Sequence, residues 1–595
     1  MLLTAPCAFG ERQPAKHFGT EVHCGLRWHE PEDEVLSIIT GDGPWSRKVW
    51  QVQQARRRAA LGAAVALRCT EEEVAYDMLS AQALRDIRCK SEVAKEAITW
   101  SPITIEDVKQ KHTQSSPGVF YGLEFPWTAQ GLVERGPDWL TEAFHAAGTM
   151  PRSNWITRIT IEKYIKITAG NNAAKFLFEV TYAQQSPHLH TQLFAKVAFP
   201  CNYATTTDRL SSSVYKQPMD FLELNTYRCL EASLPVNTPK FYYGDISNET
   251  SNYILITERI PFSEIHGINL DKPLRPFDIE GPYDKCKDWL LRGEDKEYYL
   301  LLIEQCAKIA GAYKRGATPW NYGSPPTAPE AYGLNPTAPT GENPAACRSK
   351  LVFATRFMAE TAAALFPPYV CEESFQRRWL DAMTKLNAYS AELRYWKMKD
   401  ADYVALGHGN LNTDNAYFWR DRLGTLECGI FDFGGFGVSS LPHNLWWMLN
   451  MAEADQVVAN LDTYIEAFVN RYEVHGGPRL TPDVVKMMII ITAMQNCMVM
   501  VAAIPNSLKM CSAKEFATIK DRHDPRVAEN VDGKSTLRSC IHVLNGTIRL
   551  FEELHGAEVL EEWIQEVYVK QWGCFAKENM ATYNIVEQEG TTRWG

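Results

Sequence analysis

Five segments rich in β-branched and aromatic residues are crowded into residues 156–260, and almost all of the chain after them has a helical pattern. The predicted strands are Ile156–Thr168, Lys175–Ala183, His190–Pro200, Lys240–Ile246 and Tyr253–Ile260, with a predicted helix, Met219–Ala232, between the third and the fourth. A small strand-rich lobe in front of a large helical lobe is an α+β arrangement. The sequence therefore predicts a two-lobed α+β fold.

The predicted lobes leave a long segment in front of them. Residues 1–130 are expected to be a partly helical N-terminal extension, residues 131–262 the strand-rich lobe, and residues 263–595 the helical lobe. A stretch rich in proline and glycine, residues 317–346, interrupts the helical pattern and predicts a long surface loop.

One apolar run, Met487–Ile504, invites comparison with a membrane span. It is short for that purpose, because a span needs about 20 predominantly apolar residues, and it contains three polar side chains. We expect a buried core helix that ends before Pro505, and no membrane span.

Composition narrows the class of protein. The 595 residues carry a net charge of −11 and the pI is about 5.8, whereas nucleic-acid-binding domains usually have a basic face or a high pI. We therefore expect no nucleic-acid partner.

The 15 cysteines include no Cys-x-x-Cys pair, which favours free thiols in a reducing compartment. The expected location is the cytoplasm, with an organelle transit peptide left open by Arg12 and Lys16.

The strongest motif is HGNLNTDN at His408–Asn415, followed by IFDFG at Ile430–Gly434. Kinases carry His-x-Asp, four residues, Asn, and then Asp-Phe-Gly on the next strand. An Asn and an Asp at the two ends of a short hairpin can bind the same magnesium ion, so Asn415 and Asp432 are the predicted metal ligands. Asn410 stands where the pattern has its catalytic aspartate, and His408 is expected to pack the loop.

A second group of residues belongs to the strand-rich lobe. Lys196 lies among apolar residues in a predicted strand, and a buried lysine needs an anionic partner. Glu223 in the following helix is that predicted partner. Glu258 and Ile260 are expected to form a hinge that hydrogen-bonds an adenine edge, and Gly170 is expected to lie in the loop that covers the phosphates.

Three further segments carry a resemblance to a known family: Pro137–Gly148, Glu223–Asp245 and Val438–Leu449. With the motifs above, they resemble the aminoglycoside phosphotransferase and choline kinase superfamily of protein-kinase-like folds, and especially its ecdysteroid-kinase-like branch. The resemblance covers Pro137 to at least Asn450. It implies ATP and magnesium as cofactors and phosphorylation of a hydroxyl group on a small molecule. It also implies that Lys196, Glu223, Asn415 and Asp432 are the nucleotide and metal residues.

Three departures from the family pattern leave two interpretations open. Asn410 is a neutral amide, and losing general-base catalysis costs about 10²- to 10⁴-fold in rate. Asn444 replaces an aspartate of the family, and the predicted phosphate loop, Gly170–Ala174, is poor in glycine. Asp414 is expected to face elsewhere. The chain is therefore either an attenuated phosphotransferase or a pseudokinase that serves as a nucleotide-binding or scaffolding module for a protein partner.

Overall fold

The structure is a computed structural model, and it describes residues 85, 88, 101–165, 173–198, 206–262, 273–320, 322–529 and 535–570. The chain separates into two compact units, Met1–Arg68 and Cys69–Gly595, and every described element belongs to the second. Most of the predicted N-terminal extension lies outside the described residues, and the lobe boundaries at 130 and 262 stay predictions.

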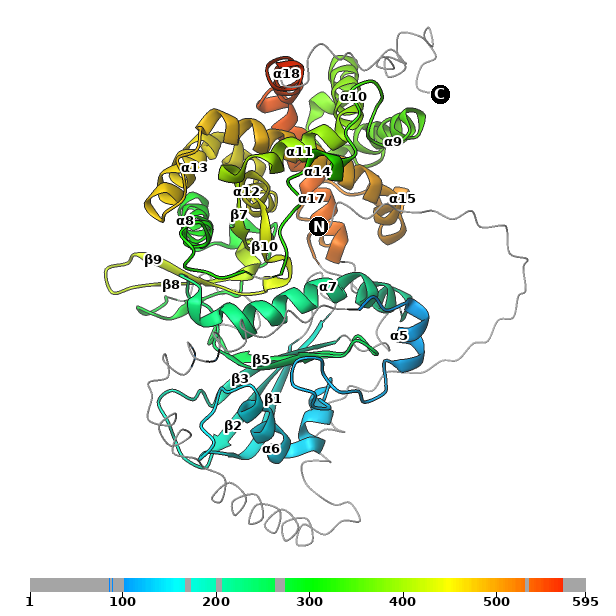
Figure 1. The fold of residues 1–595 in the computed structure, drawn as a ribbon. Helices are drawn as coiled ribbons and strands as arrows, with labels where there is room; N and C mark the ends of the chain where they lie inside the picture. Colours follow the sequence, from blue (N-terminus) through cyan, green and yellow to red (C-terminus); the bar gives the residue numbers. More distant parts are fainter. Residues whose placement is uncertain are drawn as a thin grey trace, which may run out of the picture. The chain divides into compact units, whose positions relative to one another are not determined.

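A five-stranded antiparallel sheet forms the β-rich part of the fold (Figure 1). Its strands are β1 (Ile156–Ile165), β2 (Ala173–Tyr182), β3 (Gln192–Ala198), β4 (Phe241–Ile246) and β5 (Tyr253–Glu258), in the order β1-β2-β3-β5-β4. Helix α7 (Thr206–Leu230) connects β3 to β4. All five strands occur where the sequence predicts them, and the predicted helix is the second half of α7.

Two described helices, α5 (Ile105–Lys111) and α6 (Ala129–Ala146), precede the sheet in the chain. Helix α5 contacts α7, and α6 contacts β1. The α6 helix is kinked at Gly136, whose φ of 75° is left-handed, directly before Pro137. Beyond this kink one side of the helix is buried, with Trp139 and Phe144 in the core.

A loop between α5 and α6 is fastened to the sheet. The backbone N–H groups of Phe120 and Tyr121 donate to the two carboxylate oxygens of Asp245 on β4, at 2.9 and 3.0 Å. Asp245 is fully buried, and burial raises its pKa to about 6. Gly118 passes so close that a Cβ atom there would lie 2.0 Å from the Asp245 carboxylate carbon. The 117–124 segment, called the strap below, is therefore packed against β4 of the sheet.

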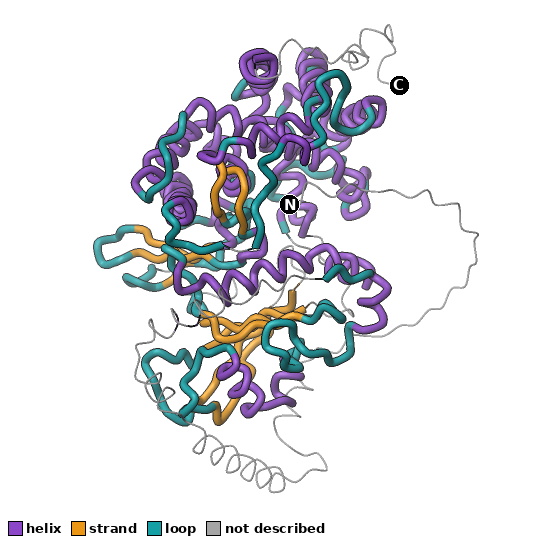
Figure 2. Tube along the Cα trace, in the orientation of Figure 1, coloured by secondary structure: helices purple, strands orange, loops and turns teal. Residues whose placement is uncertain are grey.

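The rest of the described chain is mainly helical (Figure 2). Its α-helices are α8 (Asp295–Lys314), α9 (Pro344–Arg356), α10 (Glu373–Ala388), α11 (Ser390–Lys399), α12 (Leu441–Leu449), α13 (Ala454–Val474), α14 (Pro482–Met510), α15 (Ala513–Phe516), α16 (Pro525–Ala528), α17 (Ser535–Glu553) and α18 (Gly556–Glu562). Short 3-10 turns are η1 (Glu231–Ser233), η2 (Asp288–Leu290), η3 (Pro329–Tyr332), η5 (Ala363–Leu365), η6 (Pro368–Cys371), η7 (Ala401–Tyr403), η8 (Thr413–Asn415) and η9 (Phe433–Gly435), and π-helical turns are η4 (Phe357–Thr361) and η11 (Trp563–Val569). The predicted α+β class, with a β-rich part before a larger helical part, is confirmed.

Helix α14 contains the apolar run. It is long and apolar enough to cross a membrane by composition, but 61% of its most apolar window is buried. It packs against α12 and α17, and Trp446 of α12 donates its indole N–H to Asn496 of α14 at 3.1 Å. These contacts are those of a core helix. The helix also continues through Pro505, where the sequence predicts its end, at the cost of one backbone hydrogen bond.

The segment predicted as a long loop, residues 317–346, is irregular apart from η3 and the start of α9. It is held to α11 by one buried carboxylate: the Asn335 N–H and the Thr340 hydroxyl both donate to Glu392, at 3.0 and 2.7 Å.

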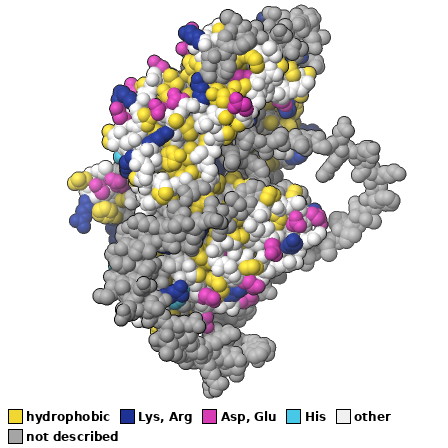
Figure 3. All heavy atoms as spheres, in the orientation of Figure 1, with side chains coloured by type: hydrophobic (Ala, Val, Ile, Leu, Met, Phe, Trp, Pro, Cys, Tyr) yellow, Lys and Arg dark blue, Asp and Glu magenta, His cyan; other side chains and the backbone are white. Residues whose placement is uncertain are grey.

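On the face of the molecule that Figure 3 shows, basic and acidic side chains are interspersed over the described surface.

Candidate functional site

Two short antiparallel pairs in the helical part carry the predicted motif. Strand β7 (Val404–Gly407) pairs with β10 (Gly437–Ser440), and β8 (Ala416–Arg420) pairs with β9 (Leu426–Ile430), to which β6 (Ile279–Glu280) adds on the β8 side. The 408–415 loop connects β7 to β8, and the 431–436 loop connects β9 to β10. This topology brings the two halves of the motif together.

The predicted lysine contacts its expected partner, Glu223, and also Asp432. The Lys196 amine lies 2.7 Å from Glu223 Oε2 and 3.1 Å from Asp432 Oδ1. Burial opposes a charge on this amine, but the carboxylates of Asp432 and Glu223 outweigh it and raise the pKa of Lys196 well above its usual value. Strand β3, helix α7 and the 431–436 loop therefore meet around one permanently charged lysine.

Asn415 is oriented by the backbone of its own loop. Its side-chain Nδ2 group donates to the Asn410 backbone carbonyl at 2.7 Å. A metal ion binds an asparagine through the amide oxygen, and this hydrogen bond engages the amide nitrogen and not the oxygen.

Asp432 has an unusual backbone conformation. Its φ of 65° and ψ of 63° are in the left-handed region, which non-glycine residues seldom adopt and which costs on the order of 1–3 kcal/mol. The residue directly precedes η9, and its conformation turns the carboxylate toward Lys196.

Three aromatic side chains connect α7 to the two loops. The Phe433 ring is fully buried and lies 5.1 Å from the Tyr227 ring of α7 and 5.3 Å from the His408 ring. His408 is also fully buried, its Nε2–H group donates to the Phe431 carbonyl at 2.9 Å, and burial lowers its pKa. A buried, neutral histidine that bonds to backbone has the packing role that the sequence predicts.

Asn410 and Asn444 both have hydrogen bonds. Asn412 Nδ2 donates to Asn410 Oδ1 at 2.8 Å, so the Asn410 amide oxygen already accepts one hydrogen bond. Asn444, at the start of α12, accepts from the Ser439 hydroxyl at 3.1 Å and packs on Gly407, where a Cβ atom would lie 2.1 Å from its amide nitrogen. It joins β10 to β7.

An ion pair that the sequence does not predict lies at the far end of the 408–415 loop. Lys285, from the segment after β6, has its amine 3.1 Å from Asp414 Oδ2. The negative charge of Asp414 raises the pKa of Lys285, and this effect is larger than that of burial, which lowers it. The charge of Asp432 raises the pKa further. Asp414 therefore faces Lys285, and where it lies relative to Asn410 stays a prediction. The spacing of residues gives no signal for Lys285.

The predicted hinge residues, Glu258 and Ile260, have contacts within the β-rich part of the fold. The Glu258 carboxylate accepts the Lys240 N–H at 3.2 Å and lies 3.3 Å from His190, so its side chain is held at the β4 side of the sheet. The Ile260 carbonyl accepts the Phe262 N–H at 2.9 Å. Gly170 lies outside the described residues. Roles for these three residues in binding adenine or phosphate stay predictions.

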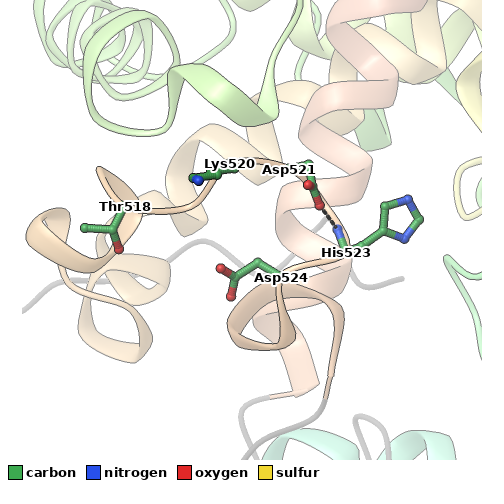
Figure 4. Close-up of a pocket in the computed structure, with 5 residues that line it drawn as sticks. All are labelled: Thr518, Lys520, Asp521, His523 and Asp524. Atoms are coloured by element: carbon green, nitrogen blue, oxygen red, sulfur yellow. Dashed lines mark hydrogen bonds between the residues drawn. The ribbon is translucent and has the colours of Figure 1, made fainter.

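Elsewhere, an open pocket of about 410 Å³ is lined by residues of a single short stretch, Thr518, Lys520, Asp521, His523 and Asp524 (Figure 4). The His523 N–H donates to Asp521 at 2.8 Å within it. None of the predicted site residues lines it. In the described part of the chain, no group of three His, Cys, Asp or Glu side chains is arranged to hold a metal ion.

Comparisons with known proteins give structural neighbours alone. No family model and no curated protein sequence matches the chain. A microcompartment-associated aminopropanol kinase is 11% identical, with 67% of this chain and 94% of that chain covered at a TM-score of 0.31. A spectinomycin phosphotransferase in complex with ADP and spectinomycin is 12% identical, with 67% and 94% covered at a TM-score of 0.30. A choline/ethanolamine kinase family protein from Mesorhizobium loti is 11% identical, with 68% and 98% covered at a TM-score of 0.27. Because these TM-scores are low, the functional proposal below depends on the chain's own residues.

Proposed function

We propose that this chain is a protein-kinase-like phosphotransferase that binds ATP and magnesium and transfers a phosphoryl group to a hydroxyl of a small molecule. One observation carries the proposal: a single buried lysine, Lys196, contacts Glu223 on one side and Asp432 on the other. Three elements that are far apart in the sequence supply these residues. Phosphoryl transfer is catalysed mainly by positioning and charge stabilisation, and this network supplies both.

The donor set fits magnesium. The hydrogen bond of Asn415 to the loop backbone engages its amide nitrogen, so its oxygen would serve as one ligand, and Asp432 would supply a carboxylate in contact with Lys196. Magnesium is usually bound by one or two protein oxygen ligands together with phosphate oxygens of the substrate, so two ligands are enough. When bound, the metal neutralises charge that develops on the phosphates.

The sheet face beside the lysine suits a nucleotide base. On that face Phe194 lies opposite Leu177, and Leu255 lies opposite Lys196. Leu177 and Leu255 are buried, and Phe194 is half-buried. An apolar surface next to a charged lysine matches a molecule with a flat ring at one end and phosphates at the other.

The second candidate function is a pseudokinase that uses the same site for binding alone. Asn410 favours it, because an amide cannot accept the proton of a substrate hydroxyl and its oxygen already accepts a hydrogen bond from Asn412. The presence of Lys196, Glu223, Asn415 and Asp432 argues against a scaffold that binds no nucleotide, because such a scaffold does not need all four.

The test of the proposal is a thermal-melt titration of the full chain with ATP, with and without magnesium. A ligand at about 100 times its Kd adds roughly 2.7 kcal/mol to stability, which is a shift of a few degrees. We expect a magnesium-dependent shift in the wild type and none in Asp432→Ala. No shift at millimolar ATP in the wild type contradicts the proposal and leaves a scaffold.

A further inference from the structure

A second lysine extends from the sheet beside Lys196. Lys175 on β2 is the direct register partner of Lys196 on β3. Opposite residues of an antiparallel pair point to the same face of the sheet, with their Cβ atoms about 4.5–5.5 Å apart. Because the Lys196 amine reaches Glu223 and Asp432, Lys175 shares the face of the sheet that borders the same site.

This arrangement is unfavourable for the protein by itself. Like charges directly opposite each other destabilise a strand pair, and burial followed by the charge of Lys196 lowers the pKa of Lys175. Asp432, Glu223 and Asp414 act in the opposite direction without cancelling the effect. A multiply charged anion between the two lysines would relieve the repulsion.

The position of Lys175 in the chain suggests which anion. Strand β2 begins at Ala173, inside the predicted phosphate loop Gly170–Ala174, and Lys175 is the third residue of the strand and the first after that predicted loop. The Gly170–Ala174 stretch contains one glycine, so few backbone N–H groups there are able to close on phosphates. A lysine at the start of the next strand is placed to supply the missing attraction.

We propose that Lys175 is a second phosphate-binding cation, which binds the phosphate chain of the nucleotide together with Lys196. This inference rests on the proposed function, because it takes a nucleoside triphosphate as the ligand. A hydrogen bond between an ammonium group and a phosphate oxygen is charge-assisted, and such bonds are roughly twice as strong as neutral ones.

The experiment is calorimetric titration of the full chain with magnesium-ATP. Lys175→Met is expected to raise the Kd about 10- to 100-fold, the effect of losing one hydrogen bond to a charged group. Lys175→Arg keeps the charge and is expected to stay within a few-fold of the wild type. Lys109→Met removes the same charge from an exposed side chain on α5, and its Kd is expected not to change.

A second readout separates binding from structure. Because Lys175 is repelled by Lys196 in the free protein, Lys175→Met is expected to leave the ligand-free Tm unchanged or to raise it. An unchanged Kd in Lys175→Met overturns this inference and leaves the proposed function intact. Equal losses of affinity in Lys175→Met and Lys175→Arg with a lowered Tm also overturn it, because they indicate a structural role. A wild type that does not bind magnesium-ATP overturns both.

Discussion

Lys285 and Asp414 form an ion pair, with 3.1 Å between the amine nitrogen and Oδ2, that ties the segment after β6 to the 408–415 loop. The other carboxylate oxygen, Asp414 Oδ1, is buried and has no hydrogen-bond partner among the described residues. Lys285 therefore supplies the one direct contact to this carboxylate that the described part of the chain shows. Both side chains are mostly buried, so the contact is shielded from solvent.

The first prediction concerns this pair. Lys285→Met leaves the Asp414 charge without its cation, and we expect the free energy of unfolding to fall by roughly 2–3 kcal/mol, somewhat less than for a fully buried pair. Urea denaturation measures the change. The double variant Lys285→Met/Asp414→Asn is expected to recover most of the loss. Strictly additive single effects would show that the two residues are not coupled.

The second prediction concerns Asn410. Asn410→Asp introduces a carboxylate where Asn412 Nδ2 already donates, so the side chain is expected to keep its position. If the rest of the site is competent, magnesium-ATP turnover with water as acceptor rises by about 10²- to 10⁴-fold, measured as released inorganic phosphate. Asn460→Asp makes the same chemical change on α13 and serves as the control. No gain in Asn410→Asp favours the pseudokinase.

The third prediction tests the 117–124 strap. A Cβ atom on Gly118 collides with the buried Asp245 carboxylate, so Gly118→Ala is expected to destabilise the fold by roughly 1–3 kcal/mol, as overpacked sites do. Gly546 in α17 has nothing within 4 Å of an added Cβ atom, and Gly546→Ala is expected to stabilise by about 1 kcal/mol. The Tm values of the two variants should move in opposite directions. A Gly118→Ala protein as stable as the wild type would mean that the strap is not packed on β4.

The fourth prediction is a pH dependence of stability. Lys397 of α11 is buried, donates to Thr492 and Gln495 of α14, and burial lowers its pKa to about 7. In the unfolded chain the pKa returns to about 10.4, so above pH 7 the unfolded state holds one more proton than the folded state. Stability from this group therefore rises with pH, by about 3 kcal/mol between pH 7 and 9.5.

Lys397→Met is the variant that checks this sign. The urea midpoint of this variant is expected to change less between pH 7 and 9.5 than that of the wild type. Lys509→Met, an exposed lysine on the same long helix α14, should keep the wild-type slope. A wild type whose stability falls over this range would contradict the prediction.

Local patterns carry most of what the sequence predicts correctly. Segments rich in β-branched and aromatic residues locate all five strands of the sheet, and the spacing of Asn410, Asn415 and Asp432 places both loops of the site. The contact of Lys196 with Glu223 follows from one physical requirement, that a buried amine needs an acid. These inferences depend on residues that are close in the chain or on a motif of known spacing.

Long-range contacts are what the sequence does not predict. Lys285 with Asp414, and Asp245 with the Phe120 backbone, join segments that share no pattern, and only the folded topology brings them together. The register that sets Lys175 opposite Lys196 comes from the pairing of β2 with β3, which the composition of the two strands does not specify. The end predicted for α14 at Pro505 was wrong because packing against neighbouring helices outweighs one missing hydrogen bond.

The left-handed backbone of Asp432 has a consequence for any variant that removes its carboxylate. Alanine at this position keeps the unfavourable conformation, whereas glycine adopts it without steric cost. Asp432→Ala and Asp432→Gly are therefore equally unable to contact Lys196, yet the glycine variant should melt at the higher temperature. The difference between the two melting temperatures reports the cost of placing a side chain in this backbone conformation. The wild-type chain accepts a cost of this kind at Asp432, where the side chain places a carboxylate beside Lys196.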